Sequence, residues 1–173
     1  MLVFAKEVGD HRYRESQGRY FEEFHVGDIY EHRPGRTITE TDNTWFTLLT
    51  MNQHPLHFDK EFAKASEFGK IVVCSPLTLA ILVGMSVQDT SGKAIANLGW
   101  GEINMPAPLF VGDTLYAESE ILNKRESKSR PSQGIVAIKT VGKKQDGAIV
   151  MSFERKMLIP MKGNAVSDKV EHY

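Results

Sequence analysis

The chain has 173 residues, 41% of them hydrophobic and 25% charged, which fits one globular domain with a core of ordinary size. The 21 Lys and Arg residues against 22 Asp and Glu give a net charge of -1, and no basic stripe with interleaved aromatics occurs, so no nucleic-acid partner is expected. The single Cys74 excludes an intrachain disulfide and favours a reducing, cytoplasmic location.

The two ends of the chain are polar and mixed in charge. We predict an N-terminal arm at 1–19 and a C-terminal tail at 162–173, each either packed on a neighbour or disordered. The arm starts with four apolar residues and then charged ones, which is not the pattern of a secretory signal. Four isolated histidines are expected to be solvated: His11, His25, His32 and His172.

A predicted buried helix ends just before a cluster of polar side chains. Apolar residues at 45, 46, 48, 49 and 51 crowd a helix face, which predicts Trp45 in the core. Pro55 removes a backbone donor and directs His54 toward extended geometry, so the helix ends there. His57 therefore lies on irregular backbone between two elements, where reactive side chains are often held.

The longest apolar stretch, 71–87, is interrupted by Ser75 and Pro76. Ser is a good helix cap and Pro suits the first helical position, so the pattern predicts a short strand or loop at 71–74 and a helix from Pro76 to about Asp89. We therefore expect no membrane span. A helix that is apolar nearly all round must be enclosed by protein.

The enclosing sheet is predicted from runs that alternate or are rich in β-branched residues. These runs lie at 29–39, 94–103, 114–124, 134–141 and 148–159. Residues 144–147, of sequence Lys-Gln-Asp-Gly, are a hairpin signal. The glycines on either side of Trp100 indicate a bulge where a strand bends. Together the elements predict an α+β fold in which an antiparallel sheet curls around one central helix.

Three segments in order give the chain a family likeness. They are 52–59 with its Pro-Leu-His core, 68–75 at the entrance to the predicted central helix, and 106–115. The sequence resembles the MaoC-like dehydratases, a hotdog-fold family that contains the R-specific enoyl-CoA hydratases. The likeness covers nearly the whole of a predicted domain at 20–161. It implies a homodimer or higher homo-oligomer of hotdog subunits, with acyl-thioester tunnels near the interface and no cofactor.

The resemblance also implies a site. The family's catalytic histidine falls on His57, and its backbone amide that polarises the thioester carbonyl falls at Ser75, where a helix start offers free donors and the positive end of the dipole. Because Pro76 has no N–H, that amide belongs to Ser75 or Leu77. The implied substrate-binding set is Ser75, Leu77, His54 and Cys74.

One position departs from the family motif, which opens with an Asp where this chain has Asn52. An amide does not exchange a proton near neutral pH, so the usual Asp and His partnership does not carry over. In the favoured reading, His57 is the only general acid and base, and the Asn52 oxygen orients water or a substrate hydroxyl. In the second, His54, Asp59 or Glu67 supplies the missing acid. In the third, catalysis is lost and the fold only binds a thioester.

The sequence thus predicts a hydro-lyase that adds water reversibly across the double bond of a 2-enoyl thioester, carried by coenzyme A or acyl carrier protein. Polar residues near the site, including Asn43, Gln53 and His54, leave room for a short, branched or dicarboxylic acyl group, of a mesaconyl or methylmalyl type. A non-catalytic thioester-binding subunit and a thioesterase on the same fold are the alternatives.

Two other patterns are weighed against this chemistry. His54, His57 and Asp59 have the residue types of a metal site, but Pro55 breaks the helix that would align them, so no metal is expected. A basic cluster either meets the phosphates of coenzyme A or is a solvated loop. Its members are Lys124, Arg125, Lys128 and Arg130.

Overall fold

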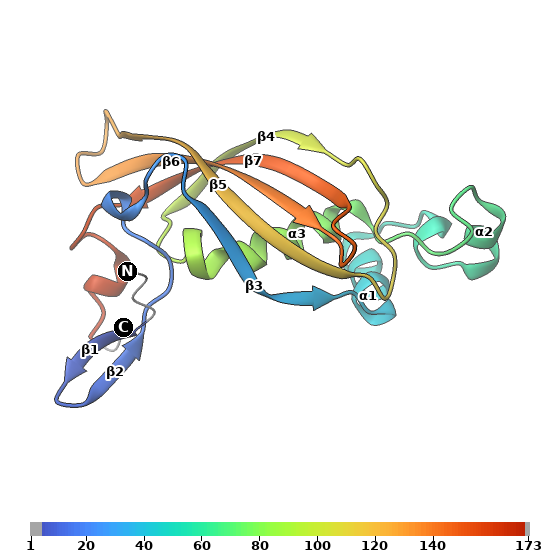
Figure 1. Ribbon diagram of the computed structural model, residues 1–173, viewed down its shortest axis with the longest axis horizontal. Helices are drawn as coiled ribbons and strands as arrows, with labels where there is room; N and C mark the ends of the chain where they lie inside the picture. The colour runs from blue at the N-terminus through green and yellow to red at the C-terminus, as the bar shows by residue number, and fades with distance from the viewer. Residues whose placement is uncertain (1–4, 172–173) are drawn as a thin grey trace.

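The structure, a computed structural model, describes residues 5–171. Its main element is a five-stranded antiparallel sheet with strand order β3-β5-β6-β7-β4 (Figure 1). The strands are β3 (Ile29–Thr37), β4 (Ala96–Asn104), β5 (Thr114–Glu126), β6 (Gln133–Lys143) and β7 (Ile149–Pro160). All five overlap the runs that the sequence predicts, so these runs are confirmed as strands.

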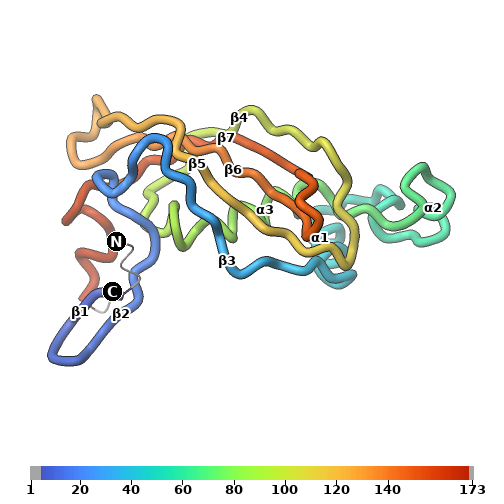
Figure 2. Tube along the Cα trace, viewed as in Figure 1, coloured from blue at the N-terminus to red at the C-terminus, as the bar shows by residue number. Residues whose placement is uncertain are grey.

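The central helix α3 (Ser75–Ser86) lies under the curved sheet, and the chain continues from it into a π-helix, η3 (Val87–Ser91) (Figures 1 and 2). The helix packs closely, because Leu82 is fully buried and a Cβ added to Gly142 of β6 would lie 2.6 Å from Leu82 Cδ1. Gly142 therefore provides room where helix and sheet approach each other. The predicted sheet around an apolar helix is confirmed.

Turns and bulges also follow the sequence. The Lys144 carbonyl accepts from the Gly147 N–H at 3.0 Å, which closes the predicted hairpin between β6 and β7. The register of β4 against β7 shifts on both sides of Trp100, as the neighbouring glycines indicate. The ring centroids of Trp100 and Phe153 lie 5.5 Å apart. Trp100 nevertheless remains 44% exposed, because β4 is an edge strand.

Two helices project from one end of the sheet, at the right of Figure 1: α1 (Glu40–Thr50) and α2 (Lys60–Ala65). The prediction that Trp45 lies in the core is wrong, since its side chain is 66% exposed. The buried residues of α1 are polar ones, Asn43 and Thr47. Phe46 packs against the core, whereas the other apolar residues of α1 form an exposed face. The exposed members are Trp45, Leu48 and Leu49, followed by Met51 just after the helix.

The arm and the tail lie together at the other end of the sheet. The arm forms a hairpin of β1 (Ala5–Gly9) and β2 (Arg12–Glu15), followed by a short helix, η1 (Phe21–Glu23). The tail contains η4 (Val166–Asp168), and the Tyr20 hydroxyl donates to Asp168 at 2.5 Å. Within residues 5–171, no helix is long and apolar enough to cross a membrane.

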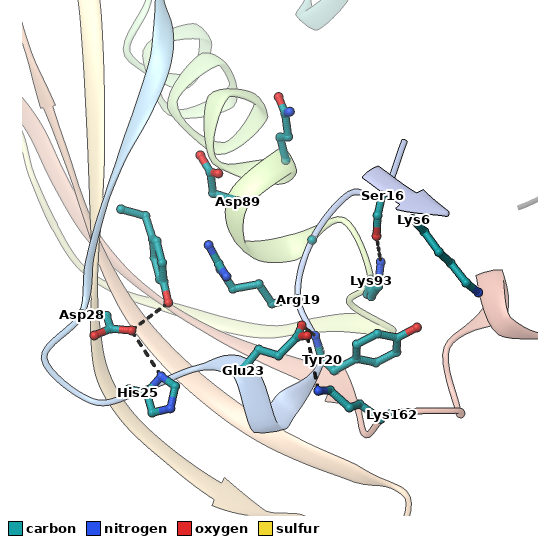
Figure 3. Close-up of a pocket in the computed structure, with 13 residues that line it drawn as sticks. Lys6, Ser16, Arg19, Tyr20, Glu23, His25, Asp28, Asp89, Lys93 and Lys162 are labelled. Atoms are coloured by element: carbon teal, nitrogen blue, oxygen red, sulfur yellow. Dashed lines mark hydrogen bonds and ion pairs between the residues drawn. The ribbon is translucent and has the colours of Figure 1, made fainter. Parts of the chain in front are cut away.

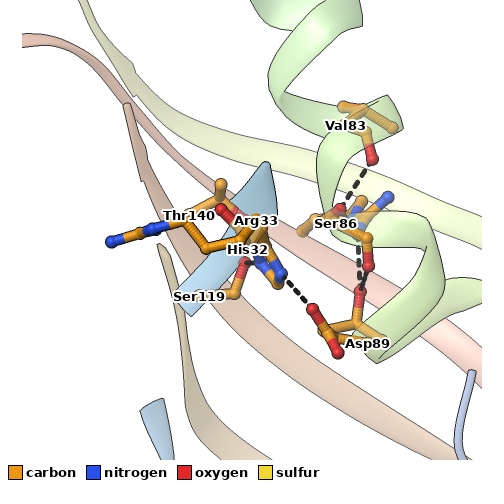
Figure 4. A network of polar contacts seen from close by, with 9 residues as sticks. His32, Arg33, Val83, Ser86, Asp89, Ser119 and Thr140 are labelled. Atoms are coloured by element: carbon orange, nitrogen blue, oxygen red, sulfur yellow. Dashed lines mark hydrogen bonds and ion pairs between the residues drawn. The ribbon is translucent and has the colours of Figure 1, made fainter. Parts of the chain in front are cut away.

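Of the four histidines expected to be solvated, His11 and His25 are exposed and His172 lies outside the described residues. His32 is a correction, since it is fully buried on the inner face of β3. Its Nδ1 lies 2.9 Å from an Asp89 oxygen and its Nε2 lies 2.8 Å from Ser119 Oγ (Figure 4). Burial lowers the pKa of His32, although the carboxylate of Asp89 opposes that shift. Asp89 of η3 and Ser119 of β5, both distant in sequence, thus hold the ring on the inner side of the sheet.

Candidate active site

His57 is the last residue of a short 3-10 helix, η2 (Pro55–His57). This helix follows α1, which ends in a left-handed cap at Met51. The side chain is half-buried, and its Nδ1 lies 2.8 Å from the carbonyl oxygen of Val72. A carbonyl only accepts, so Nδ1 carries the proton and Nε2 of the neutral ring has a free lone pair. The ring is thereby held in the tautomer that accepts a proton at Nε2.

Asn43 of α1 joins the site together. The residue is 1% exposed, its Oδ1 accepts from the Cys74 N–H at 2.9 Å, and its Nδ2 donates to the carbonyl oxygens of His57 at 2.8 Å and Val72 at 3.4 Å. One amide therefore fixes the backbone that carries His57 and the backbone that enters α3. From the sequence, Asn43 is expected only as one of the polar residues near the site, and its bonds to two distant backbone segments are not predicted.

Asn52 lies beside the same segment. Its Nδ2 is 3.2 Å from Cys74 Sγ, and its Oδ1 accepts from the His54 N–H at 3.1 Å. These contacts assign Nδ2 to the side of Cys74 and Oδ1 to the side of His54. They leave one lone pair of Oδ1 free for a water or a hydroxyl. Asn52 and His57 thus both contact the segment that enters α3, at Cys74 and Val72.

The start of α3 differs by one residue from the expected cap. Cys74, which is buried, occupies the N-cap position without a side-chain cap bond, and Ser75 is the first helical residue rather than the cap. The Leu77 N–H donates to the Cys74 carbonyl oxygen at 3.0 Å, whereas the N–H of exposed Ser75 has no acceptor within residues 5–171. Of the two candidate amides, only that of Ser75 is therefore free to bind a substrate oxygen.

His54, Asp59 and Glu67, the candidates for the missing acid, differ in their exposure and in their contacts. His54 is exposed, its Nδ1 accepts from the Leu56 N–H at 3.3 Å, and its ring centroid lies 5.8 Å from that of His57. Asp59 is the N-cap of α2, and one of its oxygens accepts two backbone N–H bonds at 3.0 Å. Glu67 is exposed in the turn after α2. His54 is thus the nearest of the three to the His57 ring by a contact that the structure records.

The metal pattern and one residue of the basic cluster can be placed in the structure. In the part of the chain from 5 to 171, no group of three His, Cys, Asp or Glu side chains has the geometry to hold a metal ion. Lys124 of the basic cluster donates to the carbonyl oxygens of Phe21 at 3.1 Å and Phe24 at 2.7 Å. Its ammonium therefore stabilises the end of η1, which supports the structural reading of that residue.

The comparisons with known proteins agree with this architecture. The chain is 31% identical over 152 residues to a mesaconyl-CoA hydratase of Cereibacter sphaeroides, covering 88% of this chain and 44% of that protein. It is 30% identical over 115 residues to an (R)-specific enoyl-CoA hydratase of Aeromonas caviae, covering 66% of this chain and 81% of that one. The chain thus spans less than half the length of the mesaconyl-CoA hydratases that it matches.

Solved structures give the same answer. A monoamine oxidase regulatory protein from Archaeoglobus fulgius superposes with a TM-score of 0.75 at 33% identity, covering 84% of this chain and 96% of that one. A conserved protein of Mycobacterium tuberculosis with a double hotdog fold superposes with a TM-score of 0.78 at 21% identity, covering 86% of this chain and 47% of that one. The curled sheet, its central helix and the Pro-Leu-His motif define a hotdog protein of the MaoC-like dehydratase family.

Within that family the assignment is narrower. The family model described as mesaconyl-CoA hydratase matches residues 3–172, which is nearly the entire chain. The chain therefore belongs to the mesaconyl-CoA hydratase family, and the predicted MaoC-like likeness is confirmed.

Proposed function

We propose that the protein is a hydro-lyase that adds water reversibly to the double bond of a 2-enoyl-CoA thioester. The observation that carries the proposal is the bond from His57 Nδ1 to the Val72 carbonyl oxygen, which leaves a free lone pair on Nε2 of the neutral ring. Val72 lies three residues before Ser75, whose N–H has no acceptor in the described part of the chain. A proton acceptor and an oxyanion donor are the two groups that this reaction requires.

In the proposed hydration, His57 Nε2 takes a proton from water as the water oxygen bonds to C3 of the enoyl group. The double-bond electrons move toward the thioester, and the Ser75 N–H stabilises the negative charge that develops on the carbonyl oxygen. The start of α3 adds the positive end of a twelve-residue helix dipole at that oxygen. The protonated His57 then delivers its proton to C2, and the reverse sequence removes water.

Asn52 has the role of a positioning residue in this scheme. Its free Oδ1 lone pair accepts from the attacking water or the product hydroxyl, while the bonds to His54 N–H and Cys74 Sγ hold the amide still. The capping role of Asp59 argues against its supplying a second acid. His54 keeps its Nε2 for a contact with substrate, as the sequence analysis expects, and its exposure favours a part of the substrate near the entrance.

We propose an acyl-CoA substrate whose acyl group is short and either branched or dicarboxylic. The support is the family match together with the names of relatives, which include mesaconyl-CoA hydratase and, in Chloroflexus aurantiacus, β-methylmalyl-CoA dehydratase. Cys74, Leu77 and Ser75 are proposed to line the thioester end of the site. The thioesterase and the non-catalytic binding subunit become outcomes of the test.

We also propose a homodimer in a reducing, cytoplasmic setting. One edge of β4 is unpaired within residues 5–171, and the strand presents apolar side chains that are about half exposed, at Leu98, Trp100 and Ile103. A second copy that pairs along this edge covers those side chains, as a stable apolar interface requires. Cys74 is free and buried, which fits the reducing location.

The test is an assay of hydration with a panel of linear, methyl-branched and dicarboxylic enoyl-CoA thioesters. Hydration is measured as the loss of absorbance of the conjugated thioester. We expect turnover, fastest with the methyl-branched dicarboxylic thioester. Release of free coenzyme A thiol without hydration would identify a thioesterase. Saturable thioester binding with neither reaction would identify a non-catalytic subunit, and both results would overturn the proposal.

A further inference from the structure

A cavity of about 540 Å³ lies beside the arm, at the other end of the sheet from α1 and α2 (Figure 1). Figure 3 shows the side chains that line it. Its walls come from the arm, the loop before η1, β3, the π-helix η3 and the tail. The side chains that the argument uses are Lys6, Arg19, Glu23, Asp28, Asp89 and Lys93. At a rise of 1.5 Å per residue, about 20 Å of helix separates Asp89 from the start of α3, so the cavity is distinct from the proposed active site.

Arg19 presents an unused pair of donors in this cavity. Its Nε and Nη2 atoms are shielded from solvent and have no hydrogen-bond partner within residues 5–171. These two N–H groups lie on one edge of the guanidinium and point the same way, the arrangement that binds two oxygens of a carboxylate or phosphate. The flat face of the group lies 4.2 Å from the centroid of the Tyr30 ring, which fixes the plane of the fork.

The carboxylates of the cavity do not supply the missing acceptor. Asp28 accepts from the Tyr30 hydroxyl at 3.0 Å and lies 3.4 Å from His25 Nδ1. Glu23 accepts from the Tyr20 N–H at 2.8 Å, and Asp89 is bound to His32 at 2.9 Å. Each acid is thus used by another partner, and none forms an ion pair with Arg19 in the described part of the chain.

Lys93 adds a second cation with neutral partners. Its Nζ donates to Ser16 Oγ at 3.0 Å and to the Gln17 carbonyl oxygen at 2.8 Å, which leaves one of its three donors. Burial lowers the pKa of Lys93, although the charges of Glu23 and Asp168 oppose that shift. Four Lys or Arg side chains line the cavity against three carboxylates, with Lys6 and Lys162 completing the basic set.

We propose that this cavity binds a small molecule through a carboxylate or phosphate group, with Arg19 as the bidentate anchor. An oxyanion satisfies both orphaned donors of Arg19 at once and offsets the cost of burying them. The Lys93 ammonium adds a second positive group to the lining of the same cavity. The cavity can enclose a group of the size of succinate or of a phosphomonoester, and its ligand is separate from the thioester bound near His57.

The test is titration calorimetry of the full chain with two probes, inorganic phosphate and succinate. We expect saturable binding of at least one probe, and which probe binds distinguishes a phosphate from a carboxylate ligand. Arg19→Gln should weaken binding at least about tenfold, since hydrogen bonds to a charged group are worth about 1.5–3 kcal/mol. Arg19→Lys keeps the positive charge but lacks the parallel donors, so it should also weaken binding. It provides the test if Arg19→Gln does not fold.

Two controls make the result specific. Arg125→Gln removes an exposed arginine outside the cavity and should leave the affinity unchanged. His57→Ala should also bind the probe as tightly as the wild type, so this outcome is independent of whether the protein hydrates thioesters. The proposal is overturned if neither probe binds the wild type, or if Arg19→Gln and Arg19→Lys bind as tightly as the wild type does.

Discussion

The Nδ1 atom of His57 lies 2.8 Å from the Val72 carbonyl oxygen, and this one contact decides which ring nitrogen can act as a base. Asn43 donates to the same carbonyl and to that of His57, so the ring and the segment entering α3 are held by common partners. A carbonyl that accepts twice from neighbouring side chains is a rigid reference point. The proposed chemistry depends on this rigidity, because a base must be held in place to accept a proton efficiently.

Replacing His57 by Gln should lower the turnover number by about 10²–10⁴-fold, the usual contribution of a general acid or base. Gln is polar and similar in length, so the fold should be retained. Steady-state hydration of the best enoyl-CoA thioester, beside circular dichroism of both proteins, makes the comparison. Wild-type turnover in a folded variant would remove His57 from the mechanism.

Replacing Asn52 by Ala should lower the turnover number by roughly tenfold or more with little change in KM, because a positioning contact acts mainly in the transition state. Asn52→Asp is the matched variant, since it keeps an oxygen that accepts from the His54 N–H and loses only the donor to Cys74 Sγ. We expect it to retain more activity than Asn52→Ala. Equal turnover of Asn52→Ala and the wild type would show that the amide orients nothing.

Replacing Asn43 by Ala should destabilise the protein by about 2–3 kcal/mol, since three polar backbone groups lose their buried partner. Thr44→Ala, one residue along the same helix, is the control and should change stability little. Urea unfolding monitored by circular dichroism measures both. A stability for Asn43→Ala equal to that of Thr44→Ala would contradict the proposed joining role.

The sequence predicted those features that depend on local patterns. The strands follow alternation, the central helix follows an apolar run, and the cluster around His57 follows from Pro55 and the family motif. The errors concern which way side chains face. Trp45 belongs to an apolar helix face that points outward, whereas His32 points inward to Asp89 and Ser119, and both outcomes depend on elements distant in sequence.

Asn43 and Arg19 show the same limit at the two ends of α3. Asn43 bonds to groups 14 to 31 residues away, and no spacing rule connects those positions. Arg19 lies in a segment that the sequence assigns to an arm, and only the folded chain places its unpaired donors in a cavity with Lys93. Polar side chains that join distant backbone segments are thus the part of a site that local patterns do not reveal.

The proposed dimer is tested at the β4 edge. Leu98→Glu places a charge on a half-exposed apolar position of that strand and should convert the dimer to monomers at micromolar concentration. Ile149→Glu, at an equally exposed position at the start of β7, is the control and should remain dimeric. Sedimentation velocity measures both. If Leu98→Glu remains dimeric, the interface does not lie at the β4 edge. If the wild type is monomeric, the proposed dimer does not form.

His32 should make stability depend on pH. Burial lowers its pKa in the folded protein below the ordinary value of 6.5, so below pH 6.5 the unfolded chain binds a proton that the folded chain does not. The free energy of unfolding should therefore be greatest above pH 6.5 and fall with decreasing pH, by up to about 1.4 kcal/mol per pH unit from this one group. The loss ends where the folded-state pKa is reached.

Asp89, Arg155 and Arg33 are the charged groups that act on the His32 ring, and variants separate the effect of His32 from that of the rest of the protein. His32→Gln removes the titration, so its unfolding free energy, although lower overall, should vary less with pH between 6.5 and 5 than that of the wild type. His25→Gln removes an exposed histidine and should keep the wild-type slope. Urea unfolding at several pH values measures all three proteins. Parallel pH profiles for the wild type and His32→Gln would mean that the buried ring does not limit stability in acid.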